Sequence, residues 1–261
     1  MIKFHPSDTS LINFANGELS FAESLMVSSH CDYCVECQHK LDTYTEQLAE
    51  KHLSDESFKI SDQHVLNADS IDTWLSQLGN EPMLTLDNND DASFLSMFDS
   101  IVSTCSEQEP SSNLSRYNEE KHFIQLEGKQ FHVPATLRKY AEVMGAWSHL
   151  IGKVWQAPVD IGGGILAQFI YMEKGGGVPE HTHKGNEFTL VLDGSFEDGI
   201  STYQTGDFIA LNAQQTHTPV SSADEGCLVF SIVDKPLHFT SGWAKFINPL
   251  SDLYFKVKIH R

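Results

Sequence analysis

The sequence of 261 residues is poor in basic side chains and has no long hydrophobic run. It holds 17 Lys and Arg against 36 Asp and Glu, a net charge of −19. Such a chain repels nucleic-acid phosphates, which argues against direct DNA or RNA binding. No stretch of about 18 apolar residues occurs, so no membrane-spanning helix is expected. The beginning, MIKFHPSDTS, has no basic and apolar signal segment, and we expect a cytoplasmic protein.

The acidic residues are concentrated in the first part of the chain. Residues 1–100 contain 18 acidic and 4 basic side chains, whereas residues 101–261 contain 18 and 13. An acidic surface most often serves solubility alone. It also suits docking to a basic protein, including one that itself binds nucleic acid.

Cysteine is scarce and unevenly placed. Three of the five cysteines, Cys31, Cys34 and Cys37, fall within seven residues, and Cys105 and Cys227 are isolated. This pattern does not fit the disulfide framework of a secreted protein. In a reducing compartment, close Cys and His residues more often bind metal. We expect Cys227 to be a small buried residue on a strand and Cys105 to be exposed in a linker.

Periodicity divides the chain into a helical part and a β part. Apolar residues with helical spacing predict a small bundle, and Trp74, Leu75 and Leu78 predict one more amphipathic helix. Later, short apolar segments punctuated by Gly, Pro, Asp and Asn predict an all-β sandwich or barrel with a helical entry segment. Helices are expected over about 7–17, 20–30 and 34–52, strands over 123–126, 165–172, 188–192, 208–211 and 228–233, and the entry segment over 135–145. The predicted parts are a helical domain 1–80, a linker 81–118, a β domain 119–240 and a tail 241–261.

The first group of chemically suggestive residues is His30, Cys34 and Cys37. If residues 30–37 lie on or lead into a helix, their spacing puts all three on one face. Two thiolates and an imidazole suit Zn²⁺, which prefers four tetrahedral nitrogen and sulfur ligands. His5, just before the first predicted helix, is the expected fourth ligand. A metal would stabilise a small helical domain with a weak core.

Cys31 leaves alternatives open, because Cys31, Cys34 and Cys37 also form two overlapping CxxC pairs. A site with three thiolates or a redox dithiol could be built from them. In a helix, Cys31 would point about 100° away from His30, and we interpret it as a neighbour of the site. The simplest alternative for the whole group is a set of small buried residues in a bundle core.

The second group is His181, His183, Glu187 and His217. His181 and His183, two apart, point to the same side of a strand, and Glu187 follows a short turn. With His217 they can converge on one ion inside a barrel. Three imidazoles and a carboxylate suit Zn, Fe, Mn or Ni, and the residue types do not select among these metals.

These motifs resemble two known families in one chain. The pattern of His30, Cys34 and Cys37, with His5 in an opening His-Pro-Ser-Asp, is similar to the zinc-dependent anti-sigma factors of the ChrR type. The segment GGGVPEHTHKGNEFTLVLDG, followed by Gly206, Asp207 and His217, resembles the two cupin motifs, with Asn212 and Gln214 where Pro and Gly are common.

The resemblance implies a two-domain fold, an N-terminal all-α zinc-binding bundle followed by an all-β cupin, a jelly-roll barrel. It also implies two zinc ions per chain, although the cupin metal could be another divalent ion. The implied function is to sequester an extracytoplasmic-function (ECF, group IV) sigma factor and release it on oxidative stress by singlet oxygen or organic hydroperoxide, with no enzymatic activity. The alternative is a metal-dependent cupin enzyme, a dioxygenase or isomerase, with a zinc-stabilised docking domain.

Overall fold

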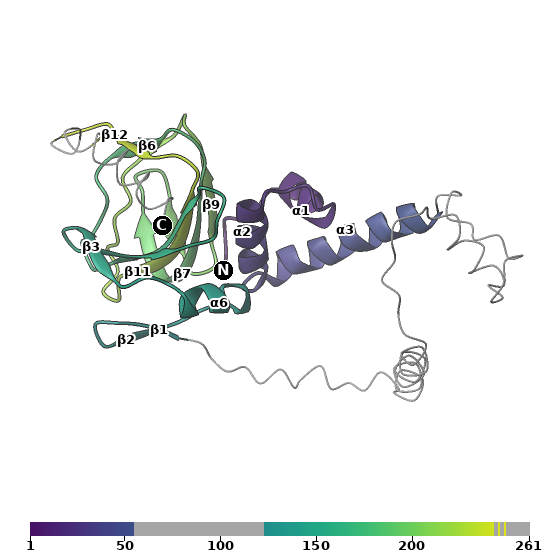
Figure 1. Cartoon of the computed structure of the whole chain (residues 1–261), viewed down its shortest axis with the longest axis horizontal. Helices are drawn as coiled ribbons and strands as arrows, with labels where there is room; N and C mark the ends of the chain where they lie inside the picture. The colour runs from purple at the N-terminus through teal and green to yellow at the C-terminus, as the bar shows by residue number, and fades with distance from the viewer. Residues whose placement is uncertain (55–122, 243–244, 246–247, 249–261) are drawn as a thin grey trace, which may run out of the picture. The chain divides into compact units, whose positions relative to one another are not determined.

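Figure 1 shows the computed structural model, which describes residues 1–54, 123–242, 245 and 248. The helices up to Leu53 and the strands belong to one compact unit of the chain. The predicted helix around Trp74, the linker 81–118 with Cys105, and nearly all of the tail lie outside the described residues. The predicted domain boundaries therefore stay a prediction.

The three predicted N-terminal helices are confirmed. They are α1 (Asp8–Ala15), α2 (Phe21–Cys31) and α3 (Val35–Ser54). The hydroxyl of Ser7 accepts a hydrogen bond from the backbone N–H of Ser10 at the start of α1. Ser20 does the same for Glu23 at the start of α2, and its hydroxyl donates to the Glu23 carboxylate. Such caps satisfy backbone donors that a helix start leaves unpaired. In the described helices, none is both long and apolar enough to cross a membrane.

The β part is an antiparallel barrel, as predicted, with a β-hairpin and a short helical segment before it. The largest sheet has seven strands in the order β3-β4-β5-β11-β7-β8, with β9 paired to β7, and a smaller sheet has the order β10-β6-β12. The strands are β1 (Phe123–Leu126), β2 (Lys129–His132), β3 (Ser148–Ile151), β4 (Val154–Val159), β5 (Leu166–Met172), β6 (His181–His183), β7 (Glu187–Glu197), β8 (Thr202–Gln204), β9 (Phe208–Leu211), β10 (Thr216–His217), β11 (Cys227–Val233) and β12 (Leu237–Phe239). The predicted entry segment is η3 (Ala135–Leu137) followed by α6 (Arg138–Glu142).

The central strands of the large sheet are buried on both faces. In β11, every residue from Cys227 to Val233 is buried. Leu228 and Phe230 belong to an outer core that also contains Met26 of α2, whereas Val229 belongs to a separate core inside the barrel. Double burial explains why this strand reads as a continuous apolar run instead of an alternating one. Because Met26 packs into the outer core, α2 covers part of the outside of the barrel.

The segment before α1 is attached to the barrel by backbone hydrogen bonds. The buried carboxylate of Asp207 accepts from the backbone N–H groups of Lys3 (2.7 Å), Phe4 (3.1 Å) and Gln204 (2.8 Å). The N–H of Phe208 donates to the carbonyl of Phe4 (2.9 Å). Asp207 therefore ties the residues just before His5 to the turn between β8 and β9.

Candidate metal centres

The structure brings His5, His30, Cys34 and Cys37 together as the sequence predicted. One donor atom from each residue lies within 4.8 Å of the others. His5 Nδ1 is 3.4 Å from Cys34 Sγ and 3.3 Å from Cys37 Sγ. A tetrahedral zinc with ordinary bond lengths would give a nitrogen–sulfur separation of roughly 3.5 Å. The spacing of the donors therefore fits one small cation, and their role as ligands stays a prediction.

The local structure that places these residues differs from one continuous helix face. α2 ends at Cys31 and α3 begins at Val35, so Cys34 lies between the two helices. The backbone N–H of Cys34 still donates to the carbonyl of His30 (3.0 Å), which keeps the two residues close. Cys31 is half-buried and is not among the four clustered donors, so the described geometry favours two thiolates over three.

The hydrogen bond of His30 sets the tautomer that a metal needs. His30 Nδ1 lies 2.8 Å from the carbonyl oxygen of Gly206, which can only accept, so Nδ1 carries the proton. Nε2 then carries a lone pair, and this buried atom has no hydrogen-bond partner. Gly206 has φ +92°, and a Cβ there would lie 2.6 Å from the side chain of Ile2, so the turn requires glycine. The barrel thus orients a candidate ligand of the helical part.

Burial keeps the side chains of His30 and Cys37 uncharged when no cation is present. It lowers the pKa of His30 to about 4, so its imidazole is neutral near pH 7. Burial, followed by the neighbouring Cys34, raises the pKa of Cys37 to about 12. A bound cation would stabilise the charged thiolates and so offset the cost of burying them. This is the usual coupling between metal binding and deprotonation.

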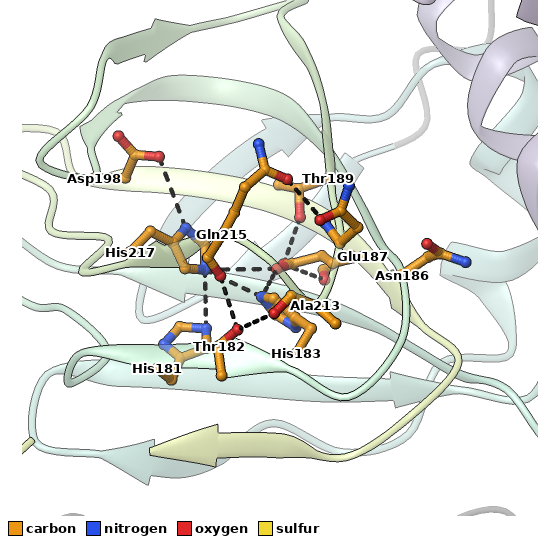
Figure 2. Close-up of polar contacts among 12 residues, drawn as sticks. His181, Thr182, His183, Asn186, Glu187, Thr189, Asp198, Ala213, Gln215 and His217 are labelled. Atoms are coloured by element: carbon orange, nitrogen blue, oxygen red, sulfur yellow. Dashed lines mark hydrogen bonds and ion pairs between the residues drawn. The ribbon is translucent and has the colours of Figure 1, made fainter. Parts of the chain in front are cut away.

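The second predicted group also converges, on the inner side of the barrel (Figure 2). His181 and His183 come from β6, Glu187 begins β7, and His217 lies on β10 opposite His181. His217 Nε2 is 3.0 Å from His181 Nε2 and 3.2 Å from His183 Nε2. Glu187 Oε2 is 2.6 Å from His183 Nε2 and 3.7 Å from His217 Nε2. All four donor atoms lie within 4.8 Å of one another.

The arrangement of these atoms fits a cation better than a hydrogen-bond network. His181 Nδ1 lies 2.9 Å from the carbonyl of Pro179 and must carry the proton, which leaves a lone pair on Nε2. Glu187 Oε2 is buried and, despite its closeness to His183, makes no hydrogen bond of acceptable angle. Lone pairs aimed at one point repel one another unless a positive ion lies between them. The residues therefore suit a metal ligated by three imidazoles and one carboxylate.

Neighbouring side chains hold Glu187 and His217 in place. Glu187 Oε1 accepts hydrogen bonds from the hydroxyls of Thr189 (2.8 Å) and Ser231 (3.2 Å), which leaves Oε2 facing the histidines. His217 Nδ1 is 3.7 Å from the Asp198 carboxylate, and Figure 2 marks this contact with a dashed line. Asp198 is itself fixed by the hydroxyl of Tyr203 (3.1 Å). Such outer groups commonly orient metal ligands.

At the second cluster, burial and neighbouring charges shift the pKa values in opposite directions. Burial lowers the pKa of His181 to about 4 and also lowers that of His217. Burial alone would raise the pKa of Glu187, but the adjacent His183, His217 and His181 together hold it well below its usual range. The cluster therefore offers the carboxylate of Glu187 and the neutral imidazoles of His181 and His217 near pH 7, which are the forms that bind metal.

Sequence reasoning missed the groups that support the two clusters. Asp198, Thr189 and Ser231 carry no recognisable local pattern, because the strand register alone brings them to the site. Asp207 was noted only as part of a cupin motif, and its contacts with the N-terminal segment are more than 200 residues apart in sequence. Cys227 is buried on β11, as predicted.

Fold and sites together define a class of protein: N-terminal helices with a His/Cys cluster, joined to a cupin barrel with a three-His, one-Glu cluster. Residues 144–235 match the family model described as the ChrR cupin-like domain. The predicted cupin domain is thereby confirmed.

Two known proteins extend this comparison. The chain is 36% identical over 103 residues to the anti-sigma-E factor ChrR of Cereibacter sphaeroides, which covers 40% of this chain and 48% of that protein. The match therefore spans about half the length of this curated relative. A chain of the crystal structure of Rhodobacter sphaeroides SigE in complex with the anti-sigma ChrR matches with a TM-score of 0.54 and 24% identity, over 90% of this chain and 100% of that one. This second similarity shows the fold.

Cupin enzymes are more distant. An acetylacetone dioxygenase from Acinetobacter johnsonii matches with a TM-score of 0.33 and 14% identity, over 40% of this chain and 80% of that chain. A similarity of this size carries no argument about activity.

Proposed function

We propose that this chain is a zinc-dependent anti-sigma factor, located in the cytoplasm, which sequesters an ECF (group IV) sigma factor and so represses transcription. The observation that carries the proposal is the convergence of His5, His30, Cys34 and Cys37 from the segment before α1, the end of α2 and the start of α3, in a chain whose second part matches the ChrR cupin-like domain. The name of the similar protein, anti-sigma-E factor, supports the same function. The chain itself is proposed to have no catalytic activity.

The donor types support zinc at the first cluster. Two sulfur and two nitrogen donors, nearly all buried, form a closed set that leaves no position for water or substrate. Such a site holds helices in place. We also propose zinc at the second cluster, where three nitrogens and one oxygen would equally suit iron, manganese or nickel.

The helices expose apolar side chains that suit a protein partner. Ile12 of α1, Phe21 of α2 and Val35 of α3 are 41%, 55% and 64% exposed, respectively. Along α3, Leu41 and Leu48 are only half-buried despite their helical spacing. Exposed apolar groups among acidic residues suit a partner with a basic surface and apolar pockets, and a sigma factor surface that otherwise binds RNA polymerase core would provide both.

The contacts between barrel and N-terminal segment suggest how a signal at the second cluster would reach the first. His217 lies beside Asp198, which holds the hydroxyl of Tyr203. The Tyr203 ring packs against Phe4, with 4.7 Å between ring centroids, and His5 follows directly. We propose that oxidation or metal loss at the cupin, caused by singlet oxygen or organic hydroperoxide, shifts this chain of contacts and weakens sigma binding. Releasing a nanomolar partner requires a coupling of several kcal/mol.

A binding experiment tests the proposal. A fluorescently labelled ECF sigma factor from the same organism would be titrated with the full-length, zinc-loaded chain and then challenged with RNA polymerase core. We expect a one-to-one complex that keeps sigma from core, and weaker binding after zinc is stripped from the chain. Free access of sigma to core in the presence of the zinc-loaded chain would contradict the proposal.

The alternative, a metal-dependent cupin dioxygenase or isomerase, is favoured by one observation. A cavity of about 290 Å³ adjoins the second cluster and is lined by His181, Glu187 and His217. The enzyme hypothesis predicts iron or manganese at this cluster and turnover of a small molecule. Zinc at the cluster together with sigma binding would favour the anti-sigma factor.

A further inference from the structure

The barrel interior contains a cavity that a metal ion would not fill. Its volume is about 290 Å³, which is enough for roughly ten atoms of water size. The walls are mostly aliphatic and aromatic side chains, among them Ile170, Val229 and Phe239. The second cluster lies at one side through His181, Glu187 and His217.

A row of polar side chains crosses the apolar interior. Gln168 of β5 is paired with Ser231 of β11, and Ser231 with Thr189 of β7. Both hydroxyls donate to Glu187 Oε1, as described above. Gln156 of β4 lies diagonally next to Gln168 and also lines the cavity. The row therefore leads from the metal cluster to two glutamines on the cavity wall.

The two glutamines are buried and incompletely hydrogen-bonded. Gln156 is 5% exposed and Gln168 is 7% exposed, and the side-chain oxygen of each is buried without a hydrogen-bond partner. An unpaired buried amide destabilises a folded protein, and most such groups in native proteins have a partner. Both side chains border the same cavity, so a ligand hydroxyl could donate to the oxygen of one amide and accept from the N–H of the other.

The charged residues of the cavity lining indicate which kind of ligand group fits there. The acidic residues of the lining are Glu187 and Asp198, and no Lys or Arg is among its described residues. A divalent ion at the second cluster would balance these two carboxylates. An additional charged group would then be buried among apolar walls without a counter-ion, which is unfavourable.

We propose that this cavity binds an uncharged, largely apolar organic molecule of about ten non-hydrogen atoms, whose hydroxyl group donates to the unpaired side-chain oxygen of Gln168 and accepts from the side-chain N–H of Gln156. The inference goes beyond the proposed function, because it holds whether or not the chain binds a sigma factor. It assigns the cavity a ligand class and gives both glutamines a role as binding residues.

The test uses the full-length, zinc-loaded chain and three probes of the same length: 1-octanol, octane and octanoate. Isothermal titration calorimetry is expected to show one 1-octanol per chain, bound at least tenfold more tightly than octane or octanoate. Absence of 1-octanol binding would overturn the proposal. Equal or tighter binding of octane or octanoate would overturn the assigned ligand class.

Replacing the glutamines separates a binding role from a structural one. Gln168→Leu is expected to weaken 1-octanol binding about tenfold, leave octane binding unchanged, and raise the Tm of the ligand-free chain, because an unpaired amide is removed. The matched control is Gln125→Leu, on the exposed side of β1, which should change neither the 1-octanol affinity nor the Tm. A fall in Tm with unchanged 1-octanol binding would show that the amide is structural and would contradict the proposal.

A measurement on the unaltered chain locates the probe. Nuclear Overhauser contacts between the 1-octanol chain and the methyl groups of Ile170 and Val229 are expected if the probe lies in the cavity. Contacts confined to methyl groups outside the barrel would overturn the assignment. This result does not depend on the folding of any variant.

Discussion

The two candidate metal centres are built from opposite kinds of parts. The first takes His30, Cys34 and Cys37 from eight consecutive residues and adds one distant ligand, His5. The second takes its ligands from β6, β7 and β10 and adjoins a cavity. A closed set with two sulfurs suits a structural role, and a set with three nitrogens and one oxygen beside a cavity suits reception of a molecule or an oxidant. Under the proposed function, the first centre would hold the partner and the second centre would receive the signal.

The barrel that carries the second centre nevertheless contacts the first centre directly. His30 is oriented by the carbonyl of Gly206, and Asp207 holds the backbone of Lys3 and Phe4. If the N-terminal part and the barrel were independent modules, these buried hydrogen bonds between them would not be expected. They make the turn between β8 and β9 the place where the barrel can influence the first centre.

The largest expected effect comes from breaking the first centre. Cys34→Ser should reduce bound zinc from two ions to one per chain and weaken sigma binding by at least 100-fold, because the helices lose the ion that fixes them. Elemental analysis and fluorescence titration measure both effects. Cys31→Ser is the matched control and should keep two ions and full affinity. Loss of an ion in the Cys31 variant would instead favour a three-thiolate site.

Breaking the second centre should have a different outcome. His183→Ala should also remove one ion, yet leave sigma affinity within about threefold, while abolishing release of sigma by singlet oxygen or organic hydroperoxide. The reason is that the ligands of the first centre remain intact. Release measured before and after oxidant exposure checks the prediction. An unchanged oxidant response in this variant would refute the sensor role of the cupin.

Disrupting the connection between the centres should have an intermediate effect. Asp207→Ala removes a buried acceptor shared by three backbone N–H groups and should lower the free energy of unfolding by about 3 kcal/mol. It should also weaken zinc binding at the first centre, because His5 loses its fixed position. Urea denaturation and competition with a zinc chelator measure the two effects. Asp224→Asn, on an exposed ion pair with Lys174, should change neither measurably.

The smallest expected effect is on the pH dependence of the metal-free chain. Burial lowers the pKa of His30 and of His181 to about 4, whereas an unfolded histidine titrates near 6.5. Between these values only the unfolded chain binds the protons, so stability is complete above about pH 6.5 and is lost as the pH falls toward about 4. We expect a loss of roughly 1–3 kcal/mol for each histidine across this range.

Urea denaturation at about pH 7.5 and about pH 4.5 checks this pH dependence. His181→Gln should remove part of the difference, and the exposed His39→Gln should preserve it. Equal stability at both pH values would contradict the assigned burial of the neutral imidazoles.

The sequence predicted what short-range spacing determines. The spacing of His30, Cys34 and Cys37, the His-x-His strand and the glycine-bounded cupin segment depend on residues within a few positions, so their structures follow from local rules. His5 and His217 lie far from the rest of their groups in sequence, and such rules do not place them. A break between helices over about 20–30 and 34–52 was predicted, and the observed break between α2 and α3 also includes Cys34.

Long-range register determines what the sequence could not predict. Asp207 meets Lys3 across 204 positions, and Gln168, Ser231 and Thr189 become a polar row only once three strands pair. No single-chain pattern marks these residues, because each is an ordinary polar residue in its own segment. The roles proposed for Asp198 and for the two buried glutamines rest on the residues that surround them in the fold.

Native mass spectrometry of the full-length chain, alone and mixed with an ECF sigma factor from the same organism, measures zinc content and sigma binding together. The account predicts two zinc ions per chain and a one-to-one complex with sigma that retains both ions. Iron or manganese in the second centre, together with no sigma complex, would contradict the account and favour a cupin enzyme.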